Sequence, residues 1–318
     1  MTQTAIILIA LGGPRSLEDV APFMAAFMGR PAPPSVVAAV VERYKLIGGK
    51  SPLPKIVKAQ AAALEKELGD TYRVYEGFRY SRPTVAQSFE KAVHDGAQRV
   101  IALSLSPFAA EVTTGAYKSA CEGLGNEETC PLFIASWHNN PLFIQAWQEH
   151  VFQGLKRFWT GQQRHVVVVF TCHSIPVRYI TAGDPYQQQV EETVKLVVDK
   201  LGIKNWRIAW QSKGARATEP WLEPGVETTL DAIAREGFKE VLEVPIGFTC
   251  DHLETLYDID IVHRTHAKNL GLAFERAASL NTSSLFIKAL ADVLKKSLEE
   301  RKGLNGTRIQ PEASGQVV

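Results

Sequence analysis

Short apolar runs alternate along the chain with longer segments in which apolar positions recur at helical spacing. Runs of this length that are rich in branched and aromatic residues predict β-strands, and the segments between them predict helices. The runs form two series of four, at 5–10, 72–77, 99–105 and 131–135, and at 165–170, 206–210, 240–245 and 271–276. Strands that alternate with helices indicate an α/β protein built from βαβ units, with parallel sheets of about four strands covered by helices on both faces.

Two segments of the chain resemble each other in this pattern. "AVHDGAQRVIALSLSPF" (92–108) and "AIAREGFKEVLEVPIGF" (232–248) both run from a helix through an acidic residue and a glycine into a strand, and both end on phenylalanine. A repeat of this kind predicts two similar α/β halves, which we expect to face each other across a cleft.

The length of 318 residues also favours two domains of about 150 residues each. We place the first half at 1–150 and the second at 151–305, with an aromatic-rich connecting helix within 140–165. No low-complexity linker separates them, so the halves should pack closely. The end of the chain, 306–318, is polar without periodicity and is expected to fray.

The composition narrows the class of protein. Hydrophobic residues make up 45% of the chain and charged residues 22%, with a formal net charge of +1. These values are typical of a globular protein in water and argue against nucleic acid as a partner. The apolar run near the N-terminus is too short to span a bilayer and follows no basic segment, so we expect a cytoplasmic protein without a transmembrane segment.

The cysteines give no metal-binding pattern. They stand at 121, 130, 172 and 250, with no C-x-x-C and no spacing typical of zinc or of an iron–sulfur cluster. Reduced thiols are the simplest interpretation, and an iron–sulfur cluster is not expected. Cys172 and Cys250 lie next to the motifs described below, which leaves open a weak contribution to a metal site.

The first candidate for chemistry is His173, in "TCHSIP", directly after the apolar run "HVVVVF". Such a run predicts a strand buried on both faces, and ligands of parallel sheets bind beyond the carboxyl ends of the strands. An imidazole at this place can hold a proton or a metal ion. The structural alternative is a histidine that merely satisfies hydrogen bonds near the core.

The second candidate is a pair of carboxylates, Glu254 and Asp258, in "GFTCDHLETLYDID". Asp251 can cap a helix that begins there, and a spacing of four residues then places both carboxylates on one helix face. Together with His173 they could bind a divalent cation or carry protons. The alternative is a solvated acidic face, a role expected more strongly for His252 and Asp260.

A nucleotide-binding loop is excluded by its context. "LIGGKSP" (46–52) has glycines before a lysine and a serine, but it lacks the full spacing of a phosphate-binding loop and follows no predicted strand.

Motifs along most of the chain give it a resemblance to the ferrochelatases, enzymes of heme synthesis. The matching segments, which extend from about residue 6 to 295 in the order of the family, are "LGGP" (11–14), "ERYKLIGGKSPL" (42–53), "EGFRYSRP" (76–83), "SPFAAEVTTGAY" (106–117), "HSIP" (173–176), "AGDPY" (182–186), "WQSKGARATEPWLEP" (210–224) and "CDHLETLYDID" (250–260). The resemblance implies two flavodoxin-like, that is Rossmann-like, halves and the insertion of Fe²⁺ into a porphyrin in the cleft between them.

The resemblance also implies roles for single residues. His173 and Glu254 would be the catalytic pair, which lie on opposite sides of the macrocycle, contact the incoming iron and accept the pyrrole protons. Asp258 would be a weaker metal ligand further along the same line of acids. Val262 stands where relatives often carry the next acid, which puts an outer metal site in doubt. Leu11 replaces a tyrosine of some relatives and excludes an axial oxygen ligand from that position.

Five further residues match porphyrin-binding positions of the family. They are Arg30, Arg43, Tyr44, Ser51 and Tyr117. Their cationic and hydroxyl groups suit the ring carboxylates or the ring face. No resident cofactor is implied, because iron is a substrate of the reaction.

The connection "PAPPSVVAAVV" (31–41) bears on the choice of porphyrin. It is short, as in relatives that act on coproporphyrin III and release coproheme, whereas relatives that act on protoporphyrin IX tend to have a longer apolar lip. Coproporphyrin III is therefore the expected substrate, with protoporphyrin IX as the alternative. A non-catalytic porphyrin or heme delivery protein and a cobalt or nickel chelatase are further alternatives. The resemblance allows peripheral membrane contact and transient contacts with neighbouring enzymes of heme synthesis.

Overall fold

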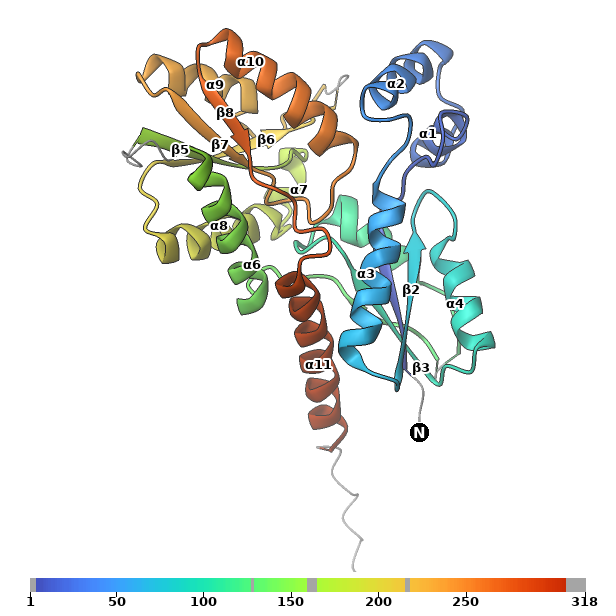
Figure 1. Cartoon of the computed structure of the whole chain (residues 1–318). Helices are drawn as coiled ribbons and strands as arrows, with labels where there is room; N and C mark the ends of the chain where they lie inside the picture. The colour runs from blue at the N-terminus through green and yellow to red at the C-terminus, as the bar shows by residue number, and fades with distance from the viewer. Residues whose placement is uncertain (1–3, 127–128, 159–164, 215–217, 307–318) are drawn as a thin grey trace, which may run out of the picture.

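Two parallel four-stranded sheets with the same strand order form the centre of the molecule (Figure 1). The orders are β2-β1-β3-β4 and β6-β5-β7-β8, and every neighbouring pair is parallel. The computed structural model describes residues 4–126, 129–158, 165–214 and 218–306, with side chains up to residue 300. The α/β class and the internal repeat predicted from the sequence are confirmed.

The first half contains, in chain order, β1 (Thr4–Ala10), α1 (Val20–Met28), α2 (Pro34–Leu46), α3 (Leu53–Leu68), β2 (Tyr72–Phe78), α4 (Val85–His94), β3 (Arg99–Ser104), the π-helical turn η1 (Glu111–Gly115), α5 (Ala116–Ser119) and β4 (Leu132–Ile134). Helices α1 and α2 stand apart from the sheet, at the open end of the first half (Figure 1).

The second half contains β5 (Val166–His173), α7 (Val177–Thr181), α8 (Tyr186–Leu201), β6 (Trp206–Gln211), α9 (Val226–Arg235), β7 (Glu240–Val244), the π-helix η4 (Glu254–His263), α10 (Arg264–Asn269), β8 (Ala273–Arg276) and α11 (Ser284–Gly306). In the chain, α6 (Pro141–Leu155) and the 3-10 turn η2 (Lys156–Phe158) lie between β4 of the first half and β5 of the second.

The central strands are buried on both faces, as their apolar sequences predict. In β1, Ile6 and Leu8 contact one cluster of buried side chains, while Ala5 and Ile7 face another, because successive side chains of a strand point to opposite sides. The first of these clusters is shared, since it also contains Val168 of β5. One core therefore joins the two halves.

Helices α6 and α11 contribute to this shared core. Each of them packs against elements of the half other than the one that precedes it in the chain. Helix α6 follows β4 of the first half, yet it packs against α8, β7 and α11. Helix α11 follows β8 of the second half, yet it packs against α3 as well as α6 (Figure 1). Because α6 spans the predicted boundary at residue 150, the exact division of the halves stays a prediction. The predicted frayed tail lies outside the described residues from 307 onward.

Within the part of the chain that the structure describes, none of the helices is both apolar and long enough to cross a bilayer.

Candidate active site

A cavity of about 320 Å³ lies where the carboxyl ends of β1, β3 and β5 face each other. The first half contributes Leu11, Phe27 and Tyr117 to its wall, and the second half contributes His173 and Glu254. Ligand sites of open parallel sheets lie beyond the carboxyl ends of the strands, and this cavity has that position in both halves at once. The cleft expected between the halves is therefore present.

His173 is the last residue of β5, which continues three residues beyond the predicted strand. Its backbone is held by the Tyr186 hydroxyl, which donates to the His173 carbonyl at 2.9 Å. The ring Nδ1 contacts the Ser174 carbonyl oxygen, which can only accept, so Nδ1 carries the proton. Nε2 then keeps its lone pair for a proton or a metal ion.

Glu254 and Asp258 lie side by side, as predicted. The hydroxyl of Ser212 donates to Glu254 Oε2 at 2.9 Å and is 3.3 Å from Asp258 Oδ2. Burial and the negative charge of Glu254 raise the pKa of Asp258 to about 6, against the opposing effects of Arg43, His263 and Ser212. Asp258 therefore changes its protonation state close to neutral pH, which suits a group that receives and releases protons.

The helix that carries this pair differs from the expectation. Residues 254–263 form a π-helix, and the carboxylate of Asp251 does not cap it. Asp251 instead accepts hydrogen bonds from Ser279, Asn281 and Arg276 at 2.8 to 3.1 Å. The prediction of a cap was wrong because side chains distant in sequence, around residues 276–281, compete for this carboxylate and neutralise it.

The predicted solvated role of His252 and Asp260 was also wrong. His252 lines the cavity, and its Nδ1 lies 3.1 Å from the Cys250 carbonyl, which leaves Nε2 unprotonated. Burial lowers the pKa of His252 below its usual value, so the ring is neutral at pH 7. Asp260 is bound by both Nε and Nη2 of Arg276 at 2.9 Å.

The residues expected to bind the porphyrin occupy different positions around the site. Tyr117 lines the cavity, and burial raises its pKa, so the phenol stays neutral. Tyr44 is buried on α2, and burial followed by the charge of Glu254 raises its pKa well above the usual value. The exposed Arg43 places its guanidinium 5.3 Å from the ring centre of Tyr257.

Arg30 and Ser51, like Arg43 and Tyr44, are not among the residues that line the cavity. Arg30 is exposed, just beyond the C-terminal end of α1. Ser51 is buried, receives a hydrogen bond from the Leu53 N–H at 3.4 Å, and lies so close to Gly13 that a Cβ there would come within 2.6 Å of its hydroxyl. The described contacts of Ser51 are therefore those of a residue that shapes the loop before α3.

Comparisons with known proteins decide the family. The family model described as Ferrochelatase matches residues 3–298. A ferrochelatase of Geobacter sp. (strain M21) is 39% identical and aligns with 92% of this chain and 98% of its own length. The chain belongs to the ferrochelatase family. Insertion of a metal ion into a porphyrin is the reaction of this family, so the chain is an enzyme of the lyase class.

Two further similarities fit this assignment. The "Coproporphyrin III ferrochelatase" of Halalkalibacterium halodurans is 33% identical over 94% of this chain and 99% of its own length. Among solved structures, SirB from Bacillus subtilis with Fe³⁺ has a TM-score of 0.57 at 13% identity, covering 95% of this chain and 98% of SirB. At that identity the second similarity shows a shared fold alone.

The structure also shows the surroundings of Leu11, where this chain differs from some relatives, and of Cys172 and Cys250, whose contribution to a metal site the sequence left open. Leu11 lines the cavity with an apolar side chain. Cys250 also lines it, but burial raises the pKa of its thiol to about 11, and burial raises that of Cys172 further. Burial therefore favours the protonated form of both thiols at neutral pH. Across the described residues, no cluster of three or more His, Cys, Asp or Glu side chains suits a metal ion.

The sequence analysis missed two residues of this site. Ser212 follows the end of β6, where it adopts a left-handed backbone with φ of 60°, a conformation that is costly for a residue with a side chain. The rule that placed His173 beyond a strand end would have found Ser212 as well. The role of Arg276, at the end of β8, could not be found in this way. It depends on Asp260 and Asp251, which lie 16 and 25 residues away in sequence.

Proposed function

We propose that this enzyme inserts Fe²⁺ into coproporphyrin III and releases coproheme. The observation that carries the proposal is the arrangement of His173 and Glu254, which come from the end of β5 and the start of η4 and line one cavity between the sheets. An imidazole nitrogen with a free lone pair and a carboxylate at one cavity can serve both as metal ligands and as proton acceptors.

The reaction requires both functions. Fe²⁺ enters the ring as two N–H bonds break, the four ring nitrogens bind the iron, and two protons leave. A group that accepts these protons must lie at the ring face, since water is largely displaced by the bound porphyrin. His173 Nε2 is one acceptor that the geometry supports, and Glu254 is a second.

Protons or hydrated iron can then move along the π-helix. Ser212 links Glu254 to Asp258 through its hydroxyl, and Asp258, with a pKa of about 6, both accepts and releases a proton near neutral pH. Val262, the next position on this face, is apolar and 36% exposed. The line of acids that we propose for transport therefore ends at Asp258 in this chain.

The choice of coproporphyrin III rests on polar partners around an open lip. Coproporphyrin III has four carboxylates, and Arg30, just beyond α1, and Arg43, on α2, are exposed, where they can reach propionates in water. The short segment 31–41, of which residues 34–41 belong to α2, supports the same choice by resemblance, as does the similarity to a relative named for coproporphyrin III. Ser51 contributes less than its position in the sequence suggested, because it is buried against Gly13.

The test is an anaerobic competition assay. The full chain is mixed with Fe²⁺ and with coproporphyrin III or protoporphyrin IX in the same detergent, and metal insertion is followed by absorbance. We expect turnover without added nucleotide or cofactor and a higher kcat/KM for coproporphyrin III. A higher kcat/KM for protoporphyrin IX would overturn the substrate and leave the family reaction in place. Tight porphyrin binding without any turnover would indicate a delivery protein.

A further inference from the structure

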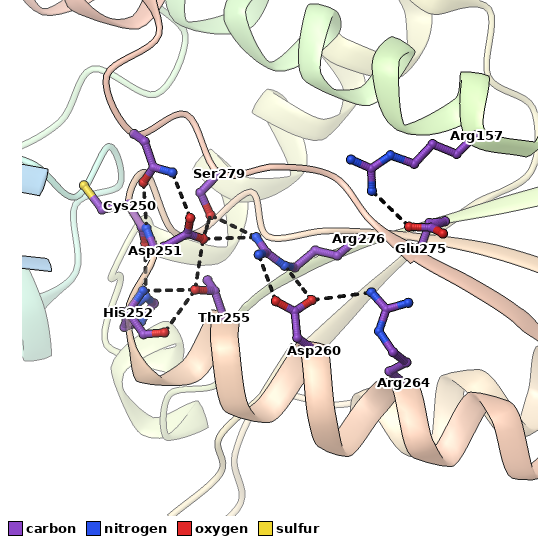
Figure 2. A network of polar contacts seen from close by, with 11 residues as sticks. Arg157, Cys250, Asp251, His252, Thr255, Asp260, Arg264, Glu275, Arg276 and Ser279 are labelled. Carbon is purple, nitrogen blue, oxygen red and sulfur yellow. Dashed lines mark hydrogen bonds and ion pairs between the residues drawn. The ribbon is translucent and has the colours of Figure 1, made fainter. Parts of the chain in front are cut away.

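We propose that Arg276 is a positioning residue for this reaction, which holds the π-helix in the orientation that directs Glu254 to the cavity and keeps Asp258 beside it. The inference rests on the proposed function for its effect on turnover. Its starting point is the polar network in Figure 2, which lies beside η4 and contacts no cavity-lining carboxylate.

Arg276 binds two carboxylates that flank the reactive pair. Its Nε and Nη2 donate to the two oxygens of Asp260, each at 2.9 Å, and its Nη1 donates to Asp251 Oδ1 at 3.1 Å (Figure 2). Asp251 precedes the helix and Asp260 lies within it, so one guanidinium fixes the segment on both sides of Glu254 and Asp258. A planar fork with fixed donors holds such an angle better than a flexible ammonium would.

The network is largely shielded from water, which makes these contacts more effective than surface ion pairs. The side chain of Arg276 is 12% exposed, against 21% for Asp251 and 27% for Asp260. Asp251 receives additional hydrogen bonds from Ser279 and Asn281. Burial alone would raise the pKa of Asp251, but Asn281, Arg276 and Ser279 outweigh it and lower the pKa, so this carboxylate stays charged and bound.

The four carboxylates in residues 251–260 therefore form two pairs with different partners. Asp251 and Asp260 do not line the cavity and are bound by Arg276, whereas within the described residues Glu254 and Asp258 share the Ser212 hydroxyl as hydrogen-bond donor. Without Arg276, Asp251 would lose the cation that it binds at 3.1 Å, and Asp260 would keep the longer ion pair with Arg264, at 3.6 Å (Figure 2).

A π-helix needs such external support. Its ladder of i→i+5 bonds is rare and occurs mostly as short pieces at functional sites. Each residue of a π-helix turns through a smaller angle about the helix axis than a residue of an α-helix. A change to α-helical pairing would therefore rotate Asp260 away from Arg276. It would also change the position of Glu254 relative to Asp258. The fork on Asp260 therefore opposes that change directly.

A neighbouring ion pair provides a matched control. Glu275 precedes Arg276 on β8 and pairs with Arg157 at 3.0 Å, but Arg157 is 54% exposed and belongs to η2, far from the π-helix (Figure 2). Arg157→Gln removes a guanidinium that pairs with the neighbouring residue on β8, Glu275, without touching the segment that carries Glu254.

The experiment compares Arg276→Gln, Arg276→Lys and Arg157→Gln in the full chain. Two measurements are made on each variant, namely hydrogen exchange of the backbone amides of residues 253–263 and steady-state insertion of Fe²⁺ with each substrate varied in turn. For Arg276→Gln we expect faster exchange in 253–263 and a loss of about tenfold or more in kcat/KM for iron, with porphyrin affinity unchanged. Arg276→Lys should restore part of both, and Arg157→Gln should match the unmodified chain.

The outcomes separate the two proposals. Faster exchange in a chain that never turns over would support the positioning role and contradict the proposed function. Unchanged exchange in Arg276→Gln, or faster exchange with full turnover, would overturn the positioning role. An equal loss of affinity for porphyrin and iron would show a general structural role instead. If Arg276→Gln does not fold, Asp260→Asn, which removes one carboxylate of the same fork, is measured in its place with the same expectations.

Discussion

At the scale of single residues, the orientation of His173 follows from one contact. The Ser174 carbonyl binds Nδ1, so the ring offers Nε2 to the cavity in a fixed tautomer. Removing the imidazole should remove a proton acceptor and a metal ligand together, while most of the cavity wall, which is built by other residues, persists.

We therefore expect His173→Ala to lower kcat for metal insertion by at least about a hundredfold, with porphyrin binding retained. The measurement is anaerobic turnover together with porphyrin fluorescence. His266→Ala serves as the control, because His266 of α10 pairs with Asp231 of α9 at 2.8 Å and does not line the cavity. Near-normal turnover of His173→Ala would remove His173 from the mechanism.

Glu254 should matter through its charge. Gln at this position can still accept a hydrogen bond from Ser212, but it cannot take up a proton from the ring. We expect Glu254→Gln to lower kcat by about a hundredfold with little change in the urea midpoint. Glu236→Gln, which affects a surface pair with Arg207, is the control. A large shift of the midpoint with normal turnover per folded molecule would make Glu254 a structural residue.

At the scale of elements, the π-helix ends in a buried pair whose protonation affects stability. His263 Nδ1 lies 3.0 Å from Glu243 of β7, and both side chains are almost fully buried. Burial lowers the pKa of His263, but the charge and hydrogen bond of Glu243, assisted by Glu227 and Asp258, outweigh it and raise the pKa overall. The folded chain thus holds this proton more tightly than the unfolded chain does.

This shift predicts how stability depends on pH. The contribution of the raised pKa is fully present below about pH 6.5, the value for an unfolded histidine, and is lost as the pH rises through the folded value. We expect the free energy of unfolding, measured in urea from pH 6 upward, to fall relative to the double variant Glu243→Gln/His263→Gln, which cannot titrate here. Parallel curves for the two proteins would contradict the raised pKa.

At the scale of the whole molecule, the shared core predicts that the two halves unfold together. Phe286 of α11 is fully buried and lies 5.9 Å from Trp137 of the first half, between ring centres. Because α11 also packs against α3 and α6, a cavity there should weaken both halves. Phe286→Ala should lower the free energy of unfolding by about 3 to 5 kcal/mol.

The measurement is urea unfolding followed by tryptophan fluorescence and by circular dichroism. Coincident single transitions, both moved to lower urea by Phe286→Ala, are expected for one cooperative unit. The exposed Phe152→Ala, on α6, is the control for loss of a phenyl ring and should change little. Two separate transitions, of which only one responds to Phe286→Ala, would show that the halves unfold independently.

The sequence by itself determined the two series of strands, the repeat and the positions of His173 and Glu254. Alternation of apolar runs with helical segments is a local property, and the end of a buried strand can be recognised without knowing its neighbours. The strand order was not predicted, but the structure repeats it as the sequence pattern does, β2-β1-β3-β4 in the first half and β6-β5-β7-β8 in the second. The proposed catalytic pair could be found because His173 and Glu254 each follow a predicted strand, at 165–170 and 240–245.

Only the tertiary structure decided which distant residues meet. Ser212 bridges Glu254 and Asp258 across 42 and 46 positions of sequence, and Arg276 reaches Asp251 across 25. The π-helical hydrogen bonding of residues 254–263 and the packing of α6 and α11 against the other half were also decided by the tertiary structure. Each depends on which distant side chains and backbone groups compete for the same partner. Local propensity carries no information about that competition. A carboxylate that looks like a cap in the sequence is therefore bound by whichever cation the fold brings closest.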